Sequence, residues 1–167
     1  MNRGFTLVEV LMYVAVLVLV VGAVLSFLLF AADSQLALVS QRSITLEGSR
    51  AMESVAKEIR EAKSIYTVTS VLDAHPGQLS LETKKALPAG EQETFVDFFL
   101  CEERLCMKRE SQTPIALTSP SVKVENLVFR QVVSGSIPSV RIELTLSSKG
   151  NQTNFTQTVS LRVYEAP

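Results

Sequence analysis

Residues that could perform catalysis are few in this chain and lie far apart in the sequence. The single histidine, His75, occupies a turn segment with proline and glycine, where a histidine is usually solvated. Aspartate occurs only at positions 33, 73 and 97, so no loop offers the closely spaced carboxylates of a calcium site. Cys101 and Cys106 are too far apart for a C-x-x-C redox motif. We therefore expect no catalytic residue, no metal site and no cofactor, and the chain is not expected to be an enzyme.

Glu9 is a carboxylate at the start of a strongly apolar N-terminal stretch. From Val10 to Ala32 the chain carries no charge. A helix over these residues would rise about 34 Å, which matches the roughly 30 Å hydrocarbon core of a bilayer. A carboxylate in that core costs about 2.5–3.5 kcal/mol, and less near its interface. The stretch predicts a transmembrane helix whose Glu9 either has a partner or extends to the lipid headgroups.

A cleaved secretory signal is the alternative for this stretch, but its apolar region is normally shorter and ends at an A-x-A-like site. The run here is longer, and the sequence LLFAADS at its end matches such a site poorly. Arg3 precedes the stretch and Asp33 is the first charge after it. The positive-inside rule then places residues 1–4 in the cytoplasm and the chain beyond Asp33 outside, where disulfides are permitted.

The composition is that of one folded domain with an apolar appendage. The chain has 167 residues, of which 47% are hydrophobic, and its formal net charge is −1. Its basic residues are spread along the sequence, so the electrostatic footprint of a nucleic-acid-binding protein is missing. We expect no nucleic-acid partner.

The segment that follows the apolar stretch is predicted to continue as an amphipathic helix over residues 33–66. No proline occurs between Gln35 and Tyr66. Charged residues such as Glu47 and Glu58 fall off a face on which apolar or small residues recur every three or four positions, as is typical of a helix with one buried side. That face consists of Leu36, Val39, Ser43, Leu46, Ser49, Met52, Val55, Ile59, Ala62 and Tyr66.

Beyond Tyr66 the hydrophobic period changes to two, which is typical of strands. Alternation runs through SIYTVTSV and QLSLET, a hairpin is predicted from Thr94–Cys101 and Leu105–Glu110, and three strands follow in VKVENLVFRQVV, SVRIELTLS and FTQTVSLRVY. One apolar and one polar face indicate an antiparallel sheet over residues 67–167, with the amphipathic helix as the cover of its apolar face. The expected fold class is α+β.

Cys101 and Cys106 flank the predicted hairpin turn, which would place them directly opposite each other. Facing residues on antiparallel strands have Cα atoms about 4.5–5.5 Å apart, which is within disulfide range. A bond that closes so short a loop would stabilise the fold by only about 2 kcal/mol. Two reduced cysteines that pack as small hydrophobic residues are the alternative, and both states stay open.

Residues 3 to about 32 closely resemble the N-terminal signature of type IV prepilins and type II secretion pseudopilins. The signature is Gly4, then Phe5-Thr6-Leu7-Val8-Glu9 and a long apolar run. In that family a prepilin peptidase cuts after the glycine, and the new N-terminal residue is N-methylated. The resemblance implies cleavage between Gly4 and Phe5, N-methylation of Phe5, and an assembly role for Glu9, which in family members pairs with the cationic N terminus of the adjacent subunit.

Later segments are similar to the minor pseudopilin J and minor pilin W group. SRAMESVAKEIREAKSI looks like the amphipathic segment of that group, and VKVENLVF with IPSVRIELTL looks like its paired C-terminal strands. Ser26 is a departure, because many pilins carry a helix-kinking proline there. Family members at the extreme filament tip often lack the glutamate, so Glu9 favours a place below the tip.

The resemblance implies a minor pilin or pseudopilin of a type IV pilus, a type II secretion pseudopilus or a competence pseudopilus. Such a subunit is anchored in the bacterial inner membrane by one span and then enters a cell-surface or periplasmic filament. Its partners would be sister pilins, the prepilin peptidase, the inner-membrane assembly platform and membrane lipid. The alternative from another class is a membrane-anchored extracytoplasmic binding domain that never polymerises and keeps Met1.

Overall fold

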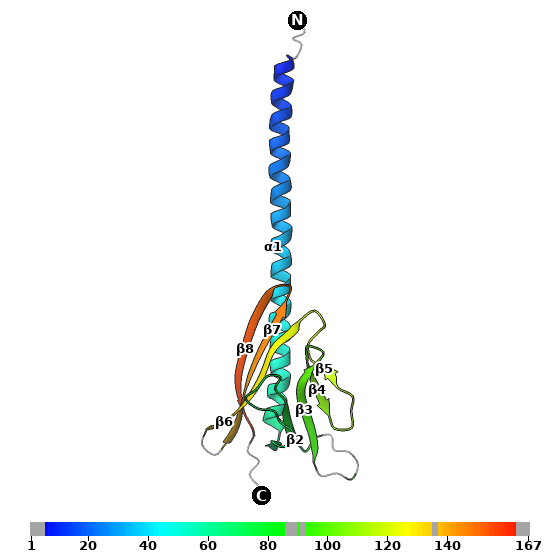
Figure 1. The fold of residues 1–167 in the computed structure, drawn as a ribbon, viewed down its shortest axis with the longest axis vertical. Helices are drawn as coiled ribbons and strands as arrows, with labels where there is room; N and C mark the ends of the chain where they lie inside the picture. Colours follow the sequence, from blue (N-terminus) through cyan, green and yellow to red (C-terminus); the bar gives the residue numbers. More distant parts are fainter. Residues whose placement is uncertain (1–5, 86–89, 91–92, 135–136, 163–167) are drawn as a thin grey trace. The chain divides into compact units, whose positions relative to one another are not determined.

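The computed structural model describes residues 6–85, 90, 93–134 and 137–162, apart from the side chains of 32–39, 133 and 134. Within these residues the chain forms one long helix and eight antiparallel strands (Figure 1). They are α1 (Leu7–Glu61), β1 (Ser64–Ile65), β2 (Leu79–Thr83), β3 (Thr94–Cys101), β4 (Arg104–Arg109), β5 (Ile115–Ala116), β6 (Lys123–Ser134), β7 (Ile137–Ser148) and β8 (Asn151–Ser160). The expected α+β fold class is confirmed. The chain divides into two compact units, residues 1–39 and 40–167.

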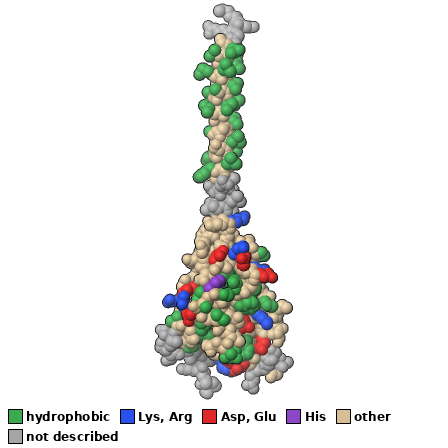
Figure 2. Space-filling model, in the orientation of Figure 1, with side chains coloured by type: hydrophobic (Ala, Val, Ile, Leu, Met, Phe, Trp, Pro, Cys, Tyr) green, Lys and Arg blue, Asp and Glu red, His purple; other side chains and the backbone are tan. Residues whose placement is uncertain are grey.

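In the first unit, α1 is apolar over Leu7–Ala31, with a mean hydropathy of 3.0. Its large hydrophobic side chains are exposed, and Figure 2 shows them along the visible face of this segment. A helix of this length and composition can cross a bilayer, where exposed apolar side chains meet lipid instead of water. Ser26 donates a hydrogen bond from its hydroxyl to the backbone oxygen of Gly22, at 2.9 Å, so its polar group is satisfied within the helix.

In the second unit, β6, β7 and β8 form a three-stranded sheet in chain order. Its buried face consists of cross-strand rows such as Leu127, Leu144 and Phe155. The part of α1 in this unit contributes Ile44, Ala51, Met52, Val55 and Ile59 to the same hydrophobic core. At Gly48 the helix backbone packs directly against the ring of Phe155, because a Cβ at this position would collide with that ring.

The other five strands form a separate sheet in the order β1-β2-β3-β4-β5. Its buried side chains, such as Leu81, Phe98 and Leu105, join the core that the three-stranded sheet and α1 share. A single sheet was expected from the sequence, so the second sheet is a correction. Period-two alternation could not predict the second sheet, because it marks the buried face of each strand but does not specify which strands are neighbours.

The buried face of α1 differs from the predicted one. Leu46 was expected on that face but is 58% exposed, whereas Ile44 and Ala51 are buried. Glu58, which was expected off that face, is 8% exposed. Because α1 contributes to a core with two sheets, its buried surface is wider than a single stripe and takes in a charged position.

The helix ends at Glu61, before the expected boundary at Tyr66, and the strand-like pattern of SIYTVTSV yields only the short β1. No glycine or proline marks this end. The backbone N–H of Lys63 donates to the oxygen of Glu82 at 2.8 Å, and its amine contacts the carboxylates of Glu82, at 2.7 Å, and Glu93. The hydrogen bond from Lys63 is the main cause that lowers the pKa of Glu82 to about 2. Residues 63–65 therefore pair with β2 where the sequence predicted the last turn of the helix.

Candidate assembly surfaces

Thr6 forms the N-terminal cap of α1. Its backbone oxygen accepts hydrogen bonds from Glu9, at 3.1 Å, and Val10, at 3.2 Å, and its hydroxyl oxygen lies 3.4 Å from the backbone nitrogen of Glu9. Threonine at the cap with glutamate three residues later is the capping-box pattern. The capping role of Thr6 was not predicted from the sequence, although the T-x-x-E spacing within the prepilin-like signature indicates it.

The side chain of Glu9 is exposed on the first turns of this helix. The hydroxyl of Tyr13, one turn later, donates to its carboxylate at 3.3 Å. A negative charge in the first turn also complements the positive end of the helix dipole. Glu9 is thus oriented by its own helix while its carboxylate remains open to a partner. Gly4 and Phe5 lie outside the described residues, so cleavage and methylation there stay predictions.

Cys101 and Cys106 lie on the β3–β4 hairpin. The turn consists of Glu102 and Glu103, both with positive φ (48° and 59°), which is the backbone of a two-residue type I′ hairpin turn. In the observed register Cys101 faces Arg104 and Cys106 faces Phe99, so the expectation that the cysteines directly oppose each other was wrong. They are diagonal neighbours with Cα atoms 5.9 Å apart, and the structure joins them as a disulfide.

We expect this disulfide in the native protein, because a diagonal Cα separation of 5.9 Å is close to the commonest value for such bonds. Mass spectrometry after alkylation without reductant should find no modified thiol at Cys101 or Cys106. Alkylation after reduction serves as the control and should modify both. The Cys101→Ser, Cys106→Ser double variant should lose only about 2 kcal/mol of unfolding free energy, since the closed loop is short. Two alkylated thiols in the unreduced protein would exclude the bond.

Two carboxylates of α1 tie the helix to distant parts of the second unit. Glu58 forms an ion pair with Arg109 of β4 at 2.6 Å. Glu47 accepts hydrogen bonds from the backbone N–H of Ser119, at 2.7 Å, and from its hydroxyl, at 2.6 Å. The sequence pattern placed both glutamates off the apolar face of the helix and did not predict these contacts, because their partners lie far along the chain.

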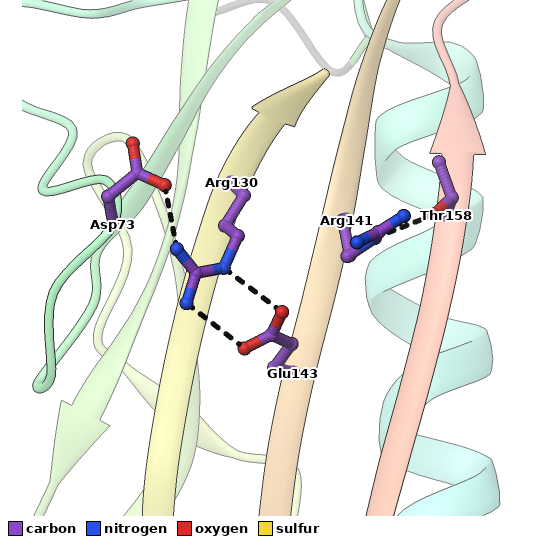
Figure 3. Close-up of polar contacts among 5 residues, drawn as sticks. All are labelled: Asp73, Arg130, Arg141, Glu143 and Thr158. Atoms are coloured by element: carbon purple, nitrogen blue, oxygen red, sulfur yellow. Dashed lines mark hydrogen bonds and ion pairs between the residues drawn. The ribbon is translucent and has the colours of Figure 1, made fainter.

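The outer face of the three-stranded sheet carries a small group of charges (Figure 3). Arg130 of β6 donates to the two carboxylate oxygens of Glu143 at 3.0 and 3.4 Å, and to Asp73 at 3.2 Å. These bonds, with Glu143 as the largest cause, raise the pKa of Arg130 above its ordinary value. Arg141 of β7 donates instead to the hydroxyl of Thr158 on β8, at 3.5 Å.

The remaining groups that could take part in chemistry are His75 and the side chains that commonly bind metals. His75, expected to be solvated, accepts a hydrogen bond at Nδ1 from the backbone N–H of Leu127, at 3.0 Å, and so has a structural partner. Over the described ranges, no three side chains of histidine, cysteine, aspartate or glutamate come together in a way that could hold a metal ion.

Comparison with known proteins identifies one feature of the chain. Residues 1–25 match the family described as the prokaryotic N-terminal methylation motif, which is a prepilin-type signal. Together with the apolar helix Leu7–Ala31, this match supports a type IV pilin-like or pseudopilin protein anchored in the inner membrane, a structural class that is processed by prepilin peptidase and assembles with other pilins. No match was found among curated proteins or among solved structures.

Proposed function

We propose that the chain is a minor pilin or pseudopilin, a structural subunit of a type IV pilus or of a type II secretion or competence pseudopilus. The observation that carries this proposal is the methylation motif at the start of a helix long and apolar enough to span a membrane. The α+β unit over residues 40–167 supports it, because all the described residues of its hydrophobic core lie beyond the apolar part of the helix, from Ile44 onward. The later segments resemble the minor pseudopilin J and minor pilin W group.

In this proposal, residues 1–4 are a cytoplasmic leader, 5–32 the transmembrane half of the helix, 33–61 its amphipathic half, and 62–167 the extracytoplasmic sheet domain. The prepilin peptidase removes the leader, and Phe5 becomes the N-methylated first residue. The inner-membrane assembly platform then inserts the subunit among sister pilins. Glu9 pairs with the N-terminal cation of its neighbour, which offsets the cost of a carboxylate in lipid.

Processing is the direct test of this proposal. The mature wild-type protein should begin at Phe5 and carry one added methyl group, as measured by N-terminal sequencing and intact mass. Gly4→Val should leave full-length precursor in the membrane, because a side chain beside the scissile bond obstructs the peptidase. Gly22→Val is the matched control, since a Cβ at that position meets no neighbouring atom, and it should be processed normally.

A mature protein that retains Met1 or Asn2 would reject both the cleavage and the pilin assignment. That result would favour the alternative, an anchored extracytoplasmic binding domain that does not polymerise.

A further inference from the structure

Strand β8 forms an open edge of the three-stranded sheet. Its 10 residues, Asn151–Ser160, include no charged residue and no proline. Its register with β7 continues from one end to the other without a bulge. Soluble proteins usually protect edges of this length with charges, proline, bulges or covering segments, because unpaired backbone groups attract another strand.

The opposite edge of the same sheet is closed. On β6, the oxygen of Phe129 accepts from Asp73 at 2.8 Å, and the oxygen of Leu127 accepts from Gly77 at 2.9 Å. The N–H of Leu127 donates to His75, and β6 contains a register shift between Val124 and Asn126. By contrast, for residues 153–159 of β8 the described structure shows no backbone hydrogen bond other than those to β7. The edge at β6 is therefore covered by residues 73–77, whereas the backbone of residues 153–159 on β8 is open to an added strand.

A groove of about 540 Å³ runs beside β8 on the inner face of the sheet. Met52 and Ala56 of α1 and Phe155 of β8 form the apolar part of its lining. The rest is polar and consists of Ser49, Glu53, Arg60, Asn154, Thr156 and Gln157. In an added strand, alternate side chains would point into this groove, since side chains on a strand alternate between the two faces. The groove thus has room for side chains at every second position of a partner strand, and its mixed lining accepts both small apolar and small polar residues.

The outer face next to β8 carries a cation without a counter-charge among the described residues. Arg130 and Arg141 face each other across β6 and β7, an arrangement that is unfavourable for like charges. The carboxylates of Glu143 and Asp73 both pair with Arg130 and not with Arg141. Arg141 is exposed, and its guanidinium extends over the sheet toward Thr158 on the edge strand (Figure 3). A carboxylate just beyond Thr158 would lie within its reach.

We propose that β8 is a docking edge for an extended strand of another protein, which adds to the sheet and carries a carboxylate beside Thr158. The backbone of the partner strand pairs with residues 153–159 of β8, and its carboxylate pairs with Arg141 on the outer face. Its alternate side chains fill the groove beside α1. A second copy of this chain does not meet these requirements through the same edge, because β8 contains no aspartate or glutamate.

The test uses the full-length protein in detergent micelles and synthetic peptides as long as β8, and it does not depend on processing or filament assembly. The peptides alternate valine and threonine, are capped at both ends and carry a fluorophore. A central threonine is replaced by glutamate in one peptide and by lysine in the other. Binding is measured by fluorescence anisotropy at low and high salt. Each peptide is also made with N-methyl groups on every second residue, in the two alternative phases.

Wild-type protein should bind the glutamate peptide roughly threefold to tenfold more tightly than the lysine peptide, with a smaller ratio at high salt. Arg141→Glu should reverse this preference. Lys108→Glu, which makes the same charge change at an exposed position on β4, should leave it unchanged. One phase of N-methylation should abolish binding and the other should be tolerated, because only alternate N–H groups of an added strand face β8.

Three results would overturn the proposal. The first is an absence of peptide binding, with or without self-association of the chain. The second is a preference that Arg141→Glu does not change. The third is an equal response to both phases of N-methylation, which would mean that the peptide binds through side chains and not as a strand.

Discussion

Glu9→Leu is expected to remove the subunit from filaments without preventing its insertion or processing. Insertion should be at least as favourable, since the substitution removes a polar group from lipid. Cleavage after Gly4 should continue because the scissile bond is unchanged. In the filament, however, the neighbour's N-terminal cation would be buried without its counter-charge. Breaking a buried pair from one side typically costs about 3–5 kcal/mol, which is a factor of several hundred or more in an association constant.

The measurement is incorporation into sheared filaments when wild type or Glu9→Leu is expressed with the other subunits of the system. The structure supplies a control, because Glu9 also belongs to the cap of α1. Thr6→Ala removes the cap hydroxyl alone and should cost about 1 kcal/mol. If Glu9→Leu and Thr6→Ala reduce incorporation equally, the loss reflects a weakened first turn of α1 and the pairing mechanism is wrong.

Arg109→Leu is expected to lower the free energy of unfolding of the second unit by about 3 kcal/mol, because it leaves a nearly buried carboxylate without its cation. The side chain of Glu58 is only 10% exposed in its pair with Arg109. The double variant Glu58→Leu, Arg109→Leu should recover most of this loss, since two apolar side chains do not need a counter-charge. Unfolding of the full-length protein by urea, followed by circular dichroism, measures each value.

Arg104→Leu provides a matched control on the same strand. The two arginines are similarly exposed, at 28% for Arg104 and 27% for Arg109, but the partner of Arg104 is Glu102, whose side chain is 84% exposed. An exposed pair of this kind contributes about 0–1 kcal/mol. Equal losses for Arg104→Leu and Arg109→Leu would show that burial of Glu58 does not set the effect.

Strong local alternation allowed the sequence to predict the longer strands well, but not the segment SIYTVTSV, which yields only β1. The strand Thr94–Cys101 has the predicted bounds, and the last three strands follow one another as expected. Each of these segments carries a period-two pattern that its own residues determine. The single predicted sheet was wrong because partner choice depends on contacts between distant segments, for which a pattern along one strand has no signal.

The candidate sites also differ in whether a local motif or a contact between distant segments defines them. The N-terminal motif is local, so Gly4, Phe5 and Glu9 could be named from the sequence. The burial of Glu58 could not, because it depends on Arg109 in a strand far along the chain. Alternation predicts that Arg141 is exposed, but only the fold shows that Arg130 has both neighbouring carboxylates and that Arg141 extends toward the edge.

The close approach of Gly48 and Phe155 has a consequence for attempts to engineer a more stable variant. Glycine within a helix is a common target for replacement by alanine, which gains roughly 1 kcal/mol of helix propensity. Here the added methyl group would occupy the space of an aromatic ring that packs against the core. The ring must move or be replaced by a smaller side chain before the helix can gain its methyl group. Positions 48 and 155 therefore form a coupled pair, and a library that varies each alone would miss the combinations that the fold can accept.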